Sequence, residues 1–279
     1  MKRVAVSILF LIAVAACAGP GGVSPGGGLI YRVPDPATVV YVTGDTLTVG
    51  IDAGAMGSME MKNTDSATWA MTFARGAGGL QVTASVQELL AEQTNPMGPS
   101  VSATENDIVG DVVFAMDPRG KTSVVSLPDL KGQAESLANP VQMVNEFFPR
   151  LPGEAVDVGA TWTDTLSYEV EMSNGMMTSS KVMTFTVQGD TVVNGAALVH
   201  ITFRGNGERV AVVAQDGMQA NQTVSGDLDG ALLWDPARSL MVRFEEDFEM
   251  DGLYEIVGAP VPPMPLTVRG KSRIMLQGG

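Results

Sequence analysis

The sequence predicts a mainly β protein, a curved antiparallel sheet or open β-barrel in two similar halves with one central helix. Long stretches alternate apolar and polar residues with a period of two, which indicates strands with one buried face. Gly-Asp, Asn-Gly and Gly-Asn pairs, which favour turns, separate these stretches, and only one segment has helical spacing. Many strands with short connections favour a strongly curved sheet or an open barrel. A two-sheet sandwich is the alternative.

The first half, residues 29–127, shows this alternation clearly. Thr38–Thr43, the pair Gly44-Asp45 and Thr46–Val49 predict a β-hairpin. The other strands of this half are expected at 69–73, 80–86, 112–116 and 122–127, the last two joined by a turn at 117–121.

Residues 128–150 are expected to connect the halves and to contain the central helix. Asn139 is an N-cap candidate, and Pro140 suits the first helical position. The residues that then share one face at helical spacing are Val141, Val144, Phe147 and Phe148. Pro149 ends the helix, which we expect to cover the concave face of the sheet or its open end.

The second half, residues 151–279, again predicts mostly strands. They are expected at 162–172, 181–188, 191–204, 208–214, 219–228, 231–234, 239–250 and 266–276. Gly110–Pro118 in the first half is similar to Gly230–Pro236 in the second, because in each an apolar strand runs into Asp-Pro and a strand returns. This similarity is the reason for expecting two related halves.

The N-terminal stretch indicates a signal peptide over residues 1–16. Lys2 and Arg3 supply positive charge, and the uncharged run Val4–Val14 has the length of a signal h-region rather than of a membrane span. Val14-Ala15-Ala16-Cys17 closes the segment with small residues before the chain's only cysteine. An ordinary secretory signal ending at Ala13-Val14-Ala15 is the alternative.

These residues resemble the lipobox of bacterial lipoproteins. The resemblance implies that Cys17 is lipidated on its sulfur, that the chain is cut before it and that the new N-terminus is acylated, for example with palmitate. Two or three acyl chains hold a protein stably on a membrane. In that family Ala18 in place of Asp favours the outer membrane, on its periplasmic face or at the cell surface. Residues 17–28 then form the lipidated cysteine and a Gly-rich flexible tether, and the β-rich domain covers 29–279.

The net charge of the chain limits the classes of molecule that it is expected to bind. Loss of Lys2 and Arg3 leaves 15 basic against 31 acidic residues, a net charge of −16. Nucleic-acid phosphates and anionic lipid surfaces repel such a chain, so we expect no nucleic-acid partner. With Cys17 on lipid, no disulfide is expected, and stability must come from a core.

The acidic run Arg243–Asp251 contains one residue that breaks the pattern. Strict alternation places Arg243, Glu245, Asp247, Glu249 and Asp251 on the outer face. Glu246 then faces inward, between Phe244 and Phe248, unless a bulge shifts the register. An inward carboxylate could meet the polar head of a ligand, and burial would raise its pKa.

Other chemistry finds little support in the sequence. His200 lies on a polar strand face, and no triad, nucleophile elbow, P-loop or dinucleotide fingerprint is present. A calcium site around Asp227 and Asp229 would not match an EF-hand spacing. The abundant methionines favour an adaptable apolar lining or ordinary core over Cu(I) binding. We expect no cofactor and no metal.

A second resemblance concerns the fold. Leu151–Trp162 looks like a recurring passage of uncharacterised bacterial lipoproteins, and the layout is similar to the half-barrels of lipoprotein carrier and acceptor proteins, which hold acyl chains. Fold alone does not fix function.

The favoured function is a non-enzymatic envelope lipoprotein that binds an apolar ligand such as a lipid or acyl chain. The candidate lining residues are Trp69, Met71, Phe73, Phe244, Glu246 and Phe248. The alternative is an interaction or scaffold subunit of an envelope assembly with a filled core and no pocket.

Overall fold

The computed structural model describes residues 28–278, apart from 55, 56, 95, 97, 173, 216 and 217. The strands of the first half are β1 (Thr38–Asp52), β2 (Ser58–Gly76), β3 (Gly79–Thr94), β4 (Val101–Thr104), β5 (Ile108–Val109), β6 (Val112–Met116) and β7 (Thr122–Ser126). A 3₁₀ turn of the first half, η2, covers Glu105–Asp107 between β4 and β5. The connection between the halves contains β8 (Asp129–Leu130), α1 (Ala134–Leu137) and α2 (Pro140–Glu146). The second half contributes β9 (Thr161–Met172), β10 (Gly175–Val193), β11 (Ala196–Gln215), β12 (Met218–Asp235), β13 (Leu240–Ile256) and β14 (Met264–Leu276).

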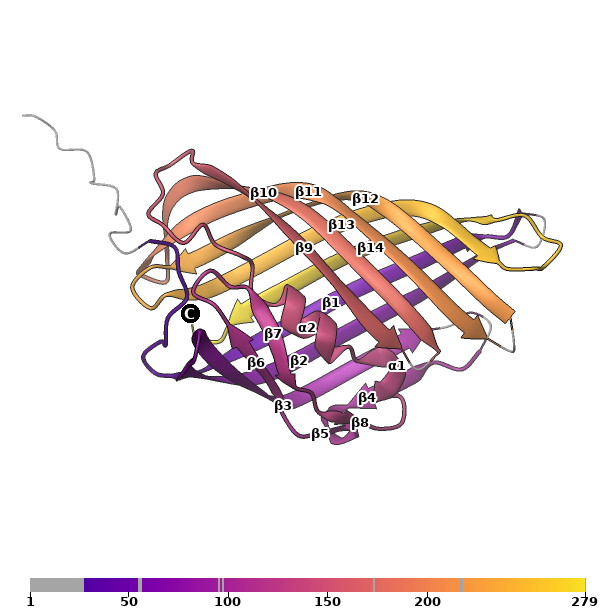
Figure 1. Cartoon of the computed structure of the whole chain (residues 1–279), viewed down its shortest axis with the longest axis horizontal. Coiled ribbons are helices and arrows are strands. Elements are labelled where there is room, and N and C mark those ends of the chain that lie inside the picture. The colour runs from indigo at the N-terminus through magenta and orange to yellow at the C-terminus, as the bar shows by residue number, and fades with distance from the viewer. Residues whose placement is uncertain are drawn as a thin grey trace, which may run out of the picture.

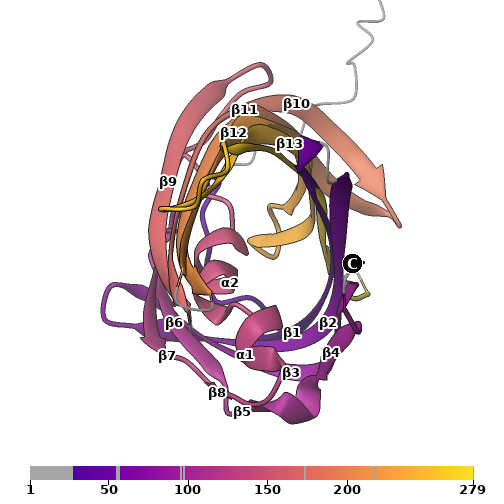
Figure 2. The ribbon, with the colours of Figure 1, turned by 90° about the vertical axis from the view of Figure 1, so that its right-hand side faces the viewer.

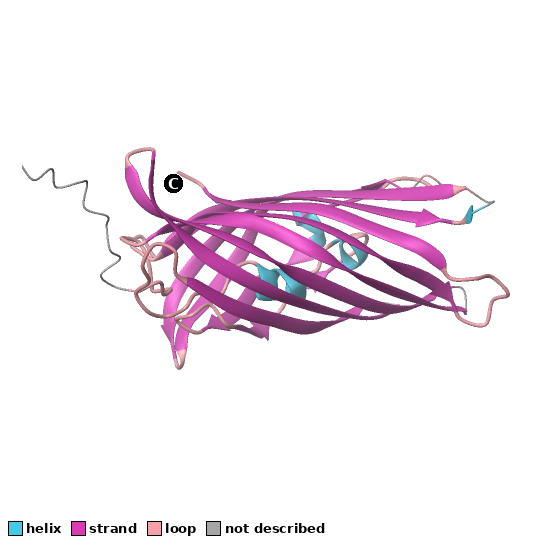
Figure 3. Cartoon of the chain, turned by 90° about the horizontal axis from the view of Figure 1, so that it is seen from above, coloured by secondary structure: helices cyan, strands magenta, loops and turns pink. Residues whose placement is uncertain are grey.

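The predicted fold class is confirmed: the chain is mainly β and forms one curled antiparallel sheet around a short helical segment (Figures 1 and 3). The strand order is β7-β6-β3-β2-β1-β14-β13-β12-β11-β10-β9, with β4 added to β3. The halves meet where β1 pairs with β14, and each then continues outward by antiparallel neighbours. Among the described residues no pairing joins β7 to β9, so the barrel is open along this line.

Helix α2 lies at this opening and contacts β6, β7 and β9 (Figure 2). The Asn139 side chain accepts a hydrogen bond from the Gln142 backbone N–H at 3.0 Å, which confirms the expected N-cap. Beyond the helix, Arg150 donates to the Thr165 carbonyl at 2.9 Å and forms an ion pair with Asp164 at 3.2 Å. These bonds attach the end of the helical segment to β9. The short helix α1 was not expected from the sequence.

The strands are longer than the sequence predicts, and the expected hairpin at Gly44-Asp45 is wrong. Residues 38–52 form one strand, in which Asp45 pairs in register with Asp65 of β2 and Ser272 of β14. Gly44-Asp45 therefore does not form a turn. Both residues lie within a continuous strand, where the polar side chain of Asp45 faces inward.

The expected boundaries in the second half need the same correction. The expected breaks at 205–207 and 229–230 lie inside β11 and β12, and the actual turn falls at Asn194-Gly195, where both residues have positive φ. Gly230 and Gly270 face inward beneath aromatic rings, because a Cβ on them would lie 2.4 Å from Phe203 Cζ and 2.2 Å from Phe248 Cζ. These glycines make room for cross-strand aromatic side chains rather than forming turns.

In both Asp-Pro turns the aspartate side chain accepts two backbone hydrogen bonds, and the similarity of the two halves stays a prediction. Asp117 Oδ1 accepts from the backbone N–H groups of Arg119 and Lys121, both at 2.9 Å. Asp235 Oδ1 accepts from those of Ala237 and Arg238 at 2.9 and 3.0 Å. Each aspartate closes a turn between two strands, β6 and β7 or β12 and β13.

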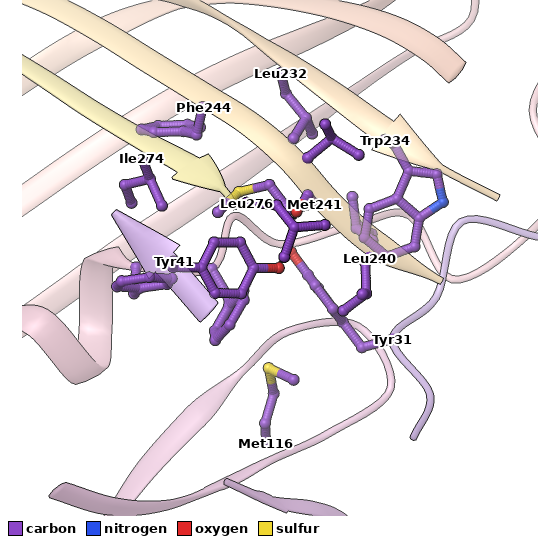
Figure 4. Packing of buried hydrophobic residues seen from close by; sticks show 14 of the residues in the cluster. Tyr31, Tyr41, Met116, Leu232, Trp234, Leu240, Met241, Phe244, Ile274 and Leu276 are labelled. Carbon is purple, nitrogen blue, oxygen red and sulfur yellow. Dashed lines mark hydrogen bonds between the residues drawn. The ribbon is translucent and has the colours of Figure 1, made fainter. Parts of the chain in front are cut away.

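One end of the barrel, which we call the base, is closed by a large apolar core. The N-terminal segment enters there: Leu29 and Tyr31 are buried, and the Tyr31 hydroxyl donates to the Pro149 carbonyl at 2.8 Å. Tyr31 packs edge-on against Phe148 and Trp234. Figure 4 shows the surrounding cluster, with side chains from the N-terminal segment, β1, β6, β12, β13 and β14. The base is therefore filled by protein.

The outer face of the sheet is polar. On β13 and β14, Glu245, Asp247 and Glu249 form cross-strand ion pairs with Arg273, Lys271 and Arg269 at 2.7–2.8 Å. Outward positions of β9 are threonine, serine and glutamate, whereas those of β10 mix threonine and serine with the exposed apolar residues Met176, Val182 and Val192. Within the described part of the chain, no helix is both long and apolar enough to cross a membrane.

Candidate functional site

The end of the barrel opposite the base, which we call the mouth, is where β1, β3, β9, β11 and β13 end (Figures 1 and 2). Inward-facing apolar side chains near this end are only partly buried. They are Leu47, Val49, Ile51, Met59, Met61, Met172, Met177 and Tyr254. Since the outer face is polar, these side chains are partly exposed on the inside, and solvent reaches the interior from the mouth.

The apolar side chains of this distal interior form separate clusters rather than one core. Val224, Met250, Leu266 and Val268 form one cluster, which we call the β13 wall. Leu166, Tyr168 and Val170 form another, which we call the β9 wall. At the base, by contrast, inward side chains from both halves of the sheet merge into a single cluster. The two walls share no apolar side chain, so they do not form one continuous core.

A belt of polar side chains separates the filled base from the distal interior. Lys181 Nζ lies 2.7 Å from Glu246 Oε1 and 3.1 Å from Glu146 Oε2. Tyr168 donates to the other oxygen of Glu146. Lys181 and Glu246 are each 5% exposed, so both charges are held inside the protein and are stabilised by each other. The polar belt consists of Asp45, Asp65, Glu146, Tyr168, Ser179, Lys181, Arg209, Glu246 and Ser272.

The pKa values within the belt follow from burial and neighbouring charges. Burial alone would raise the pKa of Glu146, but Lys181, Arg209 and the Tyr168 hydrogen bond outweigh it and lower that pKa to about 2. Burial would lower the pKa of Lys181, and the two glutamates raise it instead. Burial raises the pKa of Glu246, against the opposing effect of Lys181.

Two aspartates on neighbouring strands complete the belt. Asp45 and Asp65 are directly paired in register and face inward. Burial and the neighbouring Asp45 carboxyl raise the pKa of Asp65 to about 7, and burial raises the pKa of Asp45. Two like charges at adjacent inward positions favour retention of a proton near neutral pH.

The residues predicted to line a ligand site fall into two regions. Trp69, Met71, Phe73 and Phe244 belong to the core at the base. Glu246 lies in the belt and faces inward, in register with Ser272, so no bulge breaks the alternation at this point. Phe248 contacts both the base core and the β13 wall. A ligand-binding role for these six residues stays a prediction.

Sequence reasoning missed most of the belt. Lys181 and Asp65 each occupy an inward strand position, which is the same signal that identified Glu246, whereas Glu146 lies at the end of helix α2 and has no such signal. Cys17 and the lipobox lie outside the described residues. Among the described residues, no three His, Cys, Asp or Glu side chains are grouped to hold a metal ion, and His200 lies on the outer face.

Comparisons with known proteins add little. No protein-family model matches the chain, and no curated protein matches it. The crystal structure of Neisserial surface protein A (NspA) is similar over 85% of this chain and 96% of its own length, with 8% sequence identity and a TM-score of 0.26. A similarity of this size carries no inference about activity or location.

Proposed function

We propose that this chain is a lipid-anchored bacterial envelope lipoprotein that binds an apolar ligand, such as a lipid or acyl chain, in the distal interior of its barrel. The observation that carries the proposal is the separation of the two apolar walls, against which partly exposed apolar side chains pack toward the mouth. These side chains are Leu47, Val49, Ile51, Tyr254, Met172 and Met177. Apolar surface that water reaches is a favourable binding surface for an acyl chain. The lipobox resemblance at Cys17 supports the anchor and the envelope location.

The proposal includes no catalytic step. The interior contains no arrangement of nucleophile, base and stabilising donor among the described residues, and its lysine, Lys181, is paired with Glu146 and Glu246. Methionines at both walls suit a pliable lining, because an unbranched thioether side chain adapts to differently shaped acyl chains.

Native mass spectrometry tests ligand binding. The full chain with Cys17→Ser would be exported and purified from a bacterial periplasm. We expect a reproducible added mass that resolves to a lipid on denaturation. A clean mass that stays clean after incubation with envelope lipid extract would contradict the proposal.

Two tryptophan variants provide matched controls for this experiment. Ala211 faces inward on β11, beside Met177, and Val212 faces outward. Ala211→Trp should fill the distal interior and remove the added mass, whereas Val212→Trp should retain it.

The anchor has its own test. Cells expressing the unaltered chain should incorporate labelled palmitate into it and retain it in the membrane fraction. Cys17→Ser should lose both properties. A soluble, unlabelled wild-type chain would favour the ordinary secretory signal.

One observation favours the alternative of an interaction subunit. Strand β7 is an edge of the sheet, and Val124, Val125 and Leu127 are exposed there by 42%, 59% and 40%. Exposed apolar residues on an unpaired edge suit a protein partner. Cross-linking in cells from a residue substituted at Val125 should capture a single partner protein if this alternative holds, and none if it does not.

A further inference from the structure

Arg209 is a cation of the interior that forms no direct ion pair with a carboxylate among the described residues. It faces inward on β11, and its Nε is buried without a hydrogen-bond partner among the described residues. Its guanidinium lies 5.5 Å from the centroid of the Phe248 ring. Glu146 and Glu246 are both bonded to Lys181 instead, and neither forms an ion pair with Arg209. A buried guanidinium nitrogen without a partner is costly, and an anionic ligand atom would satisfy it.

Ser179 is a second unsatisfied group next to Arg209. The two residues are paired in register across β10 and β11, and Ser179 is paired with Tyr168 on its other side. Ser179 is 1% exposed, and its Oγ has no hydrogen-bond partner among the described residues. A hydroxyl and a guanidinium at adjacent inward positions supply donors to one oxyanion.

These two donors lie between the two apolar walls. Tyr168, on one side of Ser179, belongs to the β9 wall, and Val224, the register partner of Arg209 on β12, belongs to the β13 wall. A head group at Arg209 would therefore leave an attached acyl chain between the walls.

We propose that the distal interior binds an amphiphile with a single anionic head, a carboxylate or a phosphate, which Arg209 and Ser179 hold while the acyl chain lies between the β9 and β13 walls. This inference rests on the proposed function and specifies the class of ligand. The competing site for a cationic head is the pair Asp45 and Asp65, on strands four and five places from β11 in the sheet. Arg209 and Ser179 lie beside the walls with unsatisfied donors, and this favours an anionic head over a cationic one.

The experiment compares four probes that differ only in their heads: dodecanoate, dodecyl phosphate, dodecanol and dodecylamine. Their dissociation constants would be measured by titration calorimetry with the full chain carrying Cys17→Ser. We expect dodecanoate or dodecyl phosphate to bind roughly tenfold or more tightly than dodecanol, the effect of one charged hydrogen bond. Comparison of these two anions identifies the preferred head.

Arg209→Gln should abolish the preference for the anion while leaving the affinity for dodecanol unchanged. Arg204→Gln on the same strand, where the arginine is exposed on the outer face, should change neither. Unchanged dodecanol binding in Arg209→Gln also shows that this variant is folded.

The possible outcomes separate the two proposals. If dodecanol and the anions bind equally, the head-group inference is wrong and the apolar site stands. If dodecylamine binds best, the head lies at the aspartate pair and the inference is overturned. If none of the four probes binds, both the inference and the proposed function fail.

Discussion

Lys181 is the residue that compensates the buried acidic charges of the interior. It lies within ion-pair distance of two glutamates, and its side chain is 5% exposed. Removing one partner of a buried ion pair leaves an uncompensated charge, which is more costly than the pair is stabilising. The belt is therefore sensitive to loss of the lysine in a way that the outer ion pairs are not.

Lys181→Met should lower the free energy of unfolding by about 3–5 kcal/mol at pH 7, measured by urea denaturation. The control is Lys271→Met, which removes an exposed ion pair with Asp247 and should cost about 1 kcal/mol or less. Equal losses in the two variants would show that the inner pair is solvated.

Asp65 makes the stability of the protein depend on pH in the opposite direction from Glu146. The folded-state pKa of Asp65, about 7, lies above the ordinary value of 3.8, so the folded state binds more protons between these values. The stability that protonated Asp65 contributes to the folded state is therefore lost as pH rises from about 4 to 7. Glu146, with its pKa lowered to about 2, contributes stability above its ordinary 4.5 that is lost as pH falls.

Asp65→Asn should remove the penalty of ionising a buried carboxyl. We expect the variant to be more stable than the wild type by about 1–2 kcal/mol at pH 8. Below about pH 4, where the carboxyl is protonated in both states, the gain should vanish. Urea denaturation at the two pH values checks this, and a gain that does not depend on pH would contradict the assigned protonation.

At the scale of single elements, the long strands depend on glycines that face inward. Gly270 of β14 is paired in register with Phe248 of β13, and the ring covers the position where a Cβ would be. An added methyl group would force the ring or the strand to move.

Gly270→Ala should destabilise the protein by about 1–3 kcal/mol in thermal or urea unfolding. Gly44→Ala provides the matched control, because a Cβ at this mid-strand position would meet its nearest atom only at 4.0 Å. Phe248→Leu should recover part of the loss in the Gly270→Ala background. No recovery would indicate that backbone strain, rather than the ring, causes it.

The elements differ in how far the sequence predicted them. The helix was predicted because its signals, Asn139, Pro140 and the spacing of Val144 and Phe147, are local. The strand ends of the second half were not predicted. Sequence alone does not distinguish a glycine that lies beneath an aromatic ring within a strand from a glycine that forms a turn. The inward position of Glu246 was predictable from parity alone. Its pairing with Lys181, 65 residues away, depends on how the sheet curls, which no local pattern specifies.

At the scale of the whole molecule, packing is uneven along the barrel axis. The base contains one continuous core, whereas the distal interior contains separated walls. Local opening costs less where fewer apolar contacts must be broken.

Amide hydrogen exchange should therefore be slowest in the strand segments around Tyr41, Phe114 and Trp234 and faster around Ile51, Met61 and Met177. Addition of a bound amphiphile should slow the second group and leave the first unchanged. Uniform protection along the strands in the free protein would contradict a hollow distal half.

If the proposed ligand and lipid anchor are both present, the position of Tyr31 at the base determines the side from which the ligand enters. The chain enters the barrel at the end where Tyr31 is bonded to Pro149, and the mouth is at the other end. A 20-residue strand such as β11 extends about 66 Å at 3.3 Å per residue. A molecule anchored to its membrane through Cys17 would therefore have its closed base nearer the membrane and its mouth farther from it. Cargo would then enter and leave on the side that faces across the periplasm or the cell exterior, away from the membrane that holds the protein.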